Sequence, residues 1–181
     1  LLTQGNLYSS GQEPHPPLTR TGAEKALANA RRLAPEAGET HLAQAYFYYY
    51  GERDYNRALD ELETAINLLP NNAEVFGFAG RIDRRLNRWA DSIRHSLKAA
   101  ELDPRESRFL YQLNTTYRIL PRYREADALA YRGIAASPKS ADSFCLSNIE
   151  AALAHGEPVA PLTGLDTVPV PNLSPPTPSP L

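Results

Sequence analysis

The chain has 181 residues, with 19 lysines and arginines against 21 aspartates and glutamates, and a formal net charge of −2. This length is enough to bury the core of one domain, and the near-neutral charge argues against bulk attraction to nucleic acid or to an anionic membrane. No apolar run is long enough to span a bilayer, so we expect no membrane insertion. The single cysteine excludes a framework of internal disulfides and leaves the compartment open between cytoplasm and periplasm.

Three prolines, Pro70, Pro104 and Pro138, recur at a spacing of 34 residues. A fixed period of this length indicates an array of helical repeats rather than a domain built around one core. The period divides the middle of the chain into three contiguous units, 39–72, 73–106 and 107–140.

The segment before these units is predicted to be a degenerate first repeat, 1–38. Apolar residues at helical spacing fall where the second helix of a repeat needs them, namely Ala23, Leu27, Ala30 and Leu33. The first helix would lie within 1–12. The proline-rich stretch 13–17 cannot be helical throughout, so we expect a rigid loop between the two helices.

Each of the three units is predicted to form two amphipathic helices joined by a short turn. The pairs are expected over roughly 40–69, 74–102 and 108–136, because apolar residues recur there every three or four positions. Every unit starts its second helix with an aromatic residue (Tyr55, Trp89, Tyr123) and has a small residue ten positions later (Ala65, Ala99, Gly133). Small residues at a fixed position predict a close approach of neighbouring helices.

After the last unit, an amphipathic helix over 141–154 is expected to cap the array, because a terminal element must shield the last repeat from water. It completes a repeat domain spanning 1–156, with 141–156 as the cap. The remaining segment, 157–181, is proline-rich and favours polyproline II. Two interpretations stay open for this tail: a linker or disordered terminus, or a peptide that docks on its own groove or on a neighbouring molecule.

These patterns resemble the tetratricopeptide repeat (TPR) family. The first unit carries the family signature at Leu42, Ala45, Tyr49, Ala58, Leu62, Ala65 and Pro70. The later units match less completely, with Asp83, Ser92, Asn114 and Ala130 at signature positions. The resemblance implies an all-α fold, an α-α superhelix of antiparallel helix pairs followed by the proline-rich tail. It also implies a non-catalytic protein-protein interaction scaffold whose first helices line a concave groove.

The sequence offers no convincing catalytic, cofactor or metal site. The four histidines, His15, His41, His95 and His155, are scattered, and none has a second ligand three or four positions away. Cys145 lacks a nearby base, and no glycine-rich phosphate loop is present. We therefore expect no enzyme, no cofactor and no bound metal.

The predicted groove combines arginines and aromatic residues at positions that the resemblance assigns to the concave face. These are Phe47, Tyr50, Arg81, Arg84, Arg85, Arg108, Tyr111 and Arg118. Arginine binds carboxylates in a bidentate manner and tyrosine adds contact area with a polar tip, so we expect a protein or peptide partner with an acidic or carboxylate-bearing segment. The alternative is a solvated face whose arginines pair with acids of the chain, such as Glu74 and Asp83.

A narrower resemblance concerns Tyr46–Leu59, which looks like TPR regions of large bacterial signalling proteins fused to cyclase, kinase or winged-helix domains. It implies a regulatory or oligomerisation module, with possible self-association. The chain contains no methionine, so we expect a fragment whose effector domain is absent.

Overall fold

The computed structural model describes residues 20–146, and the elements in this part of the chain are helices without a strand. The predicted all-α class is therefore confirmed. The first helix within 1–12, the end of the capping helix and the proline-rich tail lie outside the described residues. The elements are α1 (Arg20–Leu33), α2 (Gly38–Tyr46), the π-helix η1 (Phe47–Glu52), α3 (Tyr55–Leu68), α4 (Ala73–Arg85), α5 (Trp89–Leu102), α6 (Ser107–Ile119), α7 (Tyr123–Ala136) and the 3-10 turn η2 (Pro138–Ser140).

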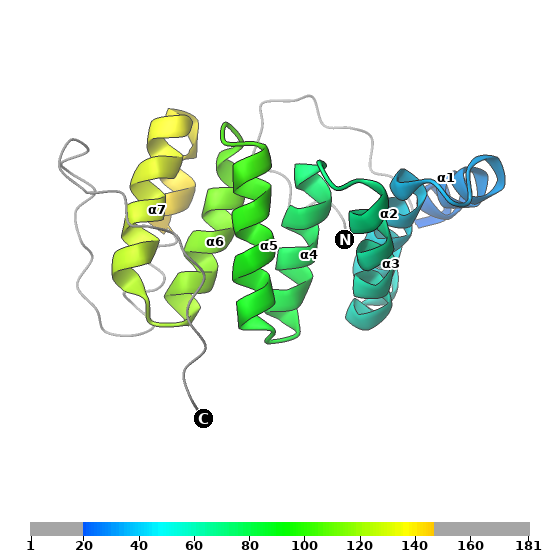
Figure 1. Cartoon of the computed structure of the whole chain (residues 1–181), viewed down its shortest axis with the longest axis horizontal. Helices are drawn as coiled ribbons and strands as arrows, with labels where there is room; N and C mark the ends of the chain where they lie inside the picture. The colour runs from blue at the N-terminus through cyan, green and yellow to red at the C-terminus, as the bar shows by residue number, and fades with distance from the viewer. Residues whose placement is uncertain (1–19, 147–181) are drawn as a thin grey trace.

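The helices stand side by side in chain order and form a row from α1 to α7 (Figure 1). α2 continues into η1 and pairs with α3, α4 pairs with α5, and α6 pairs with α7. These pairs follow the predicted ranges to within a few residues. None of the helices in the part described here is both long and apolar enough to cross a bilayer.

Local signals explain where the helices begin and end. The side chains of Asp54, Asn72 and Glu106 accept hydrogen bonds from backbone N–H groups in the first turns of α3, α4 and α6, which satisfies donors that have no partner within the helix. Arg53 and Asn87, at φ 57° and φ 59°, adopt the left-handed conformation that ends a helix. The helices are therefore connected by tight turns, both within and between the pairs.

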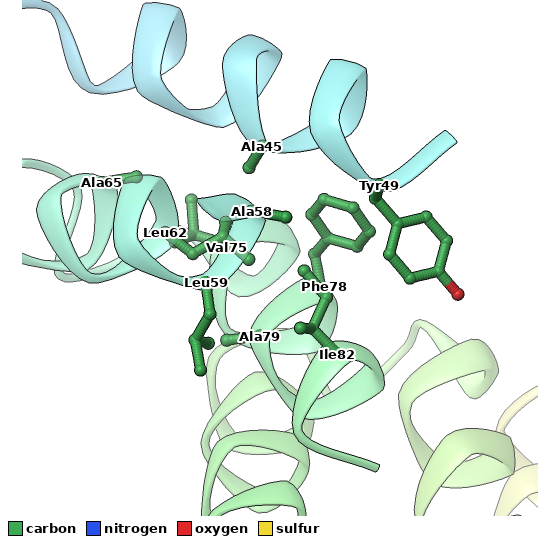
Figure 2. Packing of buried hydrophobic residues seen from close by; sticks show 10 residues of the cluster. All are labelled: Ala45, Tyr49, Ala58, Leu59, Leu62, Ala65, Val75, Phe78, Ala79 and Ile82. Carbon is green, nitrogen blue, oxygen red and sulfur yellow. The ribbon is translucent and has the colours of Figure 1, made fainter. Parts of the chain in front are cut away.

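Small residues allow the helices to pack closely. Ala45, Ala58 and Ala65 are buried against Leu62 and Phe78 in the core of the first pair (Figure 2). Ala99 is also fully buried, as its position in the repeat predicts. Larger side chains at these alanine positions would overpack the core.

Gly80 and Gly133 mark two close approaches between neighbouring helices. A Cβ atom on Gly80 would lie 2.5 Å from Ser96 Oγ and 3.1 Å from the Ser92 carbonyl oxygen, so α4 and α5 meet almost backbone to backbone. A Cβ atom on Gly133 would lie 2.1 Å from the ring of Phe144. Phe144 belongs to the helical segment 141–146, which therefore packs on α7 where the capping helix is expected.

α1 is less completely packed than its apolar pattern predicts. Leu27 is buried, but Leu33, in the last turn of α1, is 70% exposed. The middle of α1 therefore packs against the core, whereas its last turn lies outside the core.

Candidate partner-binding surface

The first helices of successive pairs, α2 with η1, α4 and α6, contact one another through polar side chains. Arg81 Nη1 of α4 donates to the Tyr50 hydroxyl of η1 over 2.9 Å, and Arg84 Nη1 approaches the Gln112 carbonyl oxygen of α6 at 3.5 Å. These contacts run across the repeats rather than within one helix pair. They bring the predicted Tyr50, Arg81 and Arg84 to one common surface.

Arg81, Arg84 and Arg85, which we call the arginine cluster, lie one turn apart on α4. Within the described part of the chain, none of the three forms an ion pair with a carboxylate. Arg85 Nε donates to the Tyr49 hydroxyl over 3.3 Å, so the hydrogen-bond partners of the cluster among the described residues are phenols, an amide and a carbonyl. Three positive charges are therefore held together without a negative partner.

Gln112 adds a second contact to the cluster. With its amide oriented so that the nitrogen donates to the Gly77 carbonyl oxygen at 2.8 Å, its side-chain oxygen accepts from Arg81 Nη2 at 2.9 Å. Gln112 is buried, so its amide orients one side of the Arg81 guanidinium.

The electrostatics of the cluster reflect this lack of acids. Burial, and then repulsion from Arg81 and Arg85, lower the pKa of Arg84 below the ordinary arginine value. The hydrogen bond to Tyr49 raises the pKa of Arg85. Arg84 is therefore the member whose charged form is least favourable in the folded protein.

Aromatic rings adjoin the cluster. The Tyr46 ring stacks on Phe78 with centroids 4.2 Å apart, and Tyr50 lies parallel to Phe78 at 6.4 Å. Tyr49 is buried beside the same phenylalanine, with its hydroxyl directed away from the apolar cluster (Figure 2). Tyr50 is 45% exposed, and its hydroxyl lies against the Arg81 guanidinium.

The remaining predicted residues are placed differently. Phe47 is half-buried in η1, and Tyr111 packs edge-on against Phe144, with centroids 5.6 Å apart. Arg108 pairs with Glu74 over 2.6 Å, and Glu74 also accepts from the Tyr46 hydroxyl.

Arg118 is the predicted residue that the structure does not bring to this surface. It is 8% exposed, and its Nη2 pairs with Asp127 of α7 over 2.5 Å. Its guanidinium therefore lies between the two helices of the last pair.

The acids that could have neutralised the arginine cluster are engaged elsewhere. Glu74 is held by Arg108 and Tyr46. Asp83 is 1% exposed and lies 2.7 Å from His95 Nδ1 of α5. The Asp83–His95 contact was missed at the sequence level, although an aspartate at the position of an inward-facing signature tyrosine is itself a signal of a buried polar pair.

Other features of the described residues suggest no chemistry. No group of three or more His, Cys, Asp or Glu among them is arranged to hold a metal ion. An open depression of about 670 Å³ lies between the α3–α4 and α5–α6 turns, bordered by the Glu74–Arg108 pair and Phe109. It is lined by residues of these two turns and of the adjoining helix ends, and its Glu74 and Arg108 neutralise one another.

Comparisons with known proteins bear on the fold. No family model matches the chain, and no curated protein sequence matches it. Among solved structures, it is similar to the crystal structure of MamA, with a TM-score of 0.63 and 20% identity, over 76% of this chain and 79% of that chain. It is also similar to the TPR domain of Arabidopsis OM64, with a TM-score of 0.60 and 20% identity, over 66% of this chain and 97% of that chain. The helical pairs and these similarities together show that the chain has the fold of a tetratricopeptide repeat domain.

Proposed function

We propose that this chain is a non-catalytic protein-protein interaction scaffold that binds an acidic segment of a partner protein on the surface formed by η1, α4 and α6. The observation that carries the proposal is the arginine cluster, whose three guanidinium groups have no carboxylate partner among the described residues. The TPR fold supports the proposal, because helical repeat arrays present extended surfaces to partners.

The surface has the chemistry that such a partner requires. Guanidinium groups offer a rigid fork of N–H donors to carboxylates, and Gln112 fixes the orientation of Arg81. The exposed ring of Tyr50 adds apolar area next to these donors. We include Phe47 and Tyr111 as the edges of the surface. Arg108 and Arg118, whose charges are neutralised by Glu74 and Asp127, belong to the scaffold.

The alternative of a solvated face with internal ion pairs has less support. It needs Glu74 and Asp83 to neutralise the cluster, but these acids contact Arg108 and His95 instead. Unpaired like charges one turn apart on a helix repel one another. A bound anion removes this repulsion, so the folded protein gains from binding one.

Charge reversal tests the proposal. A labelled glutamate-rich peptide should bind the wild-type protein in fluorescence anisotropy and lose binding to the triple variant Arg81→Glu, Arg84→Glu, Arg85→Glu. The matched control reverses three exposed arginines of α5, the α5–α6 turn and α7 (Arg94, Arg105 and Arg124), which changes the net charge by the same amount. Equal affinity in the two triple variants would show that binding depends on total charge and not on this surface.

A further inference from the structure

We propose that the arginine cluster recognises a phosphorylated side chain within the partner segment. This inference rests on the proposed function and narrows its ligand from any acidic group to a doubly charged oxyanion. It comes from three properties of the cluster: its hydrogen-bond donors, its charge and its openness.

The cluster offers hydrogen-bond donors to a ligand and no acceptor that would need a donor from the ligand. Arg81 and Arg85 donate to the phenolic oxygens of Tyr50 and Tyr49. A phenol that accepts in this way keeps its own O–H to donate, and neither hydroxyl donates to another described residue. The matching ligand therefore carries several oxygens that only accept.

The charge of the cluster exceeds what one carboxylate supplies. Arg81, Arg84 and Arg85 hold three positive charges at positions i, i+3 and i+4 of α4. A carboxylate brings one negative charge on two oxygens. A phosphomonoester brings close to two charges on three terminal oxygens and commonly binds opposite arginine clusters. One phosphate can thus contact more than one guanidinium and relieve the repulsion that acts on Arg84.

The openness of the cluster favours a phosphate carried on a polypeptide over free phosphate. Arg85 is exposed and Tyr50 is 45% exposed, so one side of the bound group would remain uncovered. A covalently attached chain covers that side and contacts the Tyr50 ring. Free phosphate and a phosphorylated side chain both carry the tetrahedral anion. The experiment below distinguishes between these two ligands.

The test compares three short peptides that differ at one central residue: phosphoserine, aspartate or serine. Each is acetylated and amidated to remove terminal charges and has a phenylalanine beside the central residue. By calorimetry or anisotropy, we expect the phosphoserine peptide to bind about tenfold tighter than the aspartate peptide, which corresponds to about 1.4 kcal/mol. The serine peptide should not bind, and the cluster triple variant should lose all binding while the control triple variant keeps it.

Each other outcome has a defined meaning. If aspartate and phosphoserine peptides bind equally and both depend on the cluster, the phosphate inference is overturned and the proposed function stands. If neither acidic peptide binds in a cluster-dependent way, the proposed function itself fails. If inorganic phosphate binds as tightly as the phosphopeptide, the ligand is the free anion and the assignment to a polypeptide is overturned.

The pH dependence gives an independent readout. Because the second pKa of a phosphomonoester is about 6, binding of the phosphoserine peptide should weaken between about pH 7.5 and about pH 5.5, whereas an aspartate, with a pKa of about 3.9, stays charged. The titratable groups described around the cluster are arginines and tyrosines, contributed by α4, η1, α3 and α6. Arginine and tyrosine do not titrate in this range. A pH-independent affinity for the phosphopeptide would contradict recognition of the dianion.

Discussion

Replacing Arg84 by methionine should stabilise the protein, although most substitutions of partly buried residues do the opposite. Arg84 is partly buried on α4, faces repulsion from Arg81 and Arg85, and has only a 3.5 Å contact with a carbonyl oxygen. Methionine keeps much of the apolar stem and removes the charge. Repulsion of one charge by two neighbouring charges in a partly solvated site destabilises the folded state by on the order of 1 kcal/mol. We therefore expect Arg84→Met to raise the free energy of unfolding by about 0.5–1.5 kcal/mol.

The matched control is Arg118→Met, for which we expect the opposite sign. Arg118 occupies the same position in the corresponding helix of the next repeat and is buried, but its guanidinium pairs with Asp127. Its removal leaves a carboxylate without its partner, and since Asp127 keeps some exposure to solvent, we expect a loss of about 2 kcal/mol. The pair of variants separates the effect of an arginine without a carboxylate partner from that of a paired one.

Urea unfolding followed by circular dichroism measures both effects. With a slope of about 2 kcal/mol per molar urea, the midpoint should rise by about 0.5 M for Arg84→Met and fall by about 1 M for Arg118→Met. Salt at about 1 M shortens the range of the repulsion to about 3 Å, so it should stabilise the wild type more than Arg84→Met. A midpoint of Arg84→Met at or below that of the wild type would refute the claim that the cluster is strained by unpaired charge.

Two further predictions concern packing and electrostatics elsewhere in the molecule. Gly80→Ala should lower the free energy of unfolding by about 1 kcal/mol in urea titrations, because overpacking against α5 and Ser96 outweighs the gain in helix propensity. Gly51→Ala, whose new Cβ would only touch a ring at 3.5 Å, should be neutral or stabilising, and equal losses at both glycines would contradict the close approach at Gly80. Burial and the Glu74 carboxylate raise the pKa of Tyr46 above the ordinary value; a raised pKa stabilises the fold below the unfolded pKa, so stability should fall above about pH 10. Tyr46→Phe should weaken that fall in urea midpoints measured against pH, and an unchanged pH profile would contradict it.

The period and the small residues made the architecture predictable. Pro70, Pro104 and Pro138 end equivalent helices in register, and Ala99 is buried where the repeat position predicts. These signals act locally or at fixed spacing, so they can be read from one sequence. Asn114, which stands at a signature position of the repeat, is buried and donates to the Ala126 carbonyl oxygen over 2.6 Å.

The choice of ion-pair partners could not be predicted from position alone. Arg84 and Arg118 occupy the same repeat position, yet only Arg118 finds a carboxylate, because the helix packed against it carries Asp127. Similarly, Glu74 pairs with Arg108 of the next repeat instead of Arg81 of its own helix. Such pairings depend on side-chain rotamers and on which side chains of neighbouring repeats lie within reach. A periodic sequence pattern gives no information on either.

Under the proposed function, the distribution of charge along the first helices separates arginines of the scaffold from arginines of the binding surface. At Arg108 and Arg118, the fold supplies an acid from a neighbouring helix, as expected where a cation serves stability. On α4, one repeat earlier, Arg81 and Arg84 are supported by neutral oxygens that orient a guanidinium without cancelling its charge. A sequence selected for stability alone would place an acid or an apolar residue beside them, and functional sites are where such local conflicts are expected to persist. The acid missing from the described residues is the one that we expect the partner to supply.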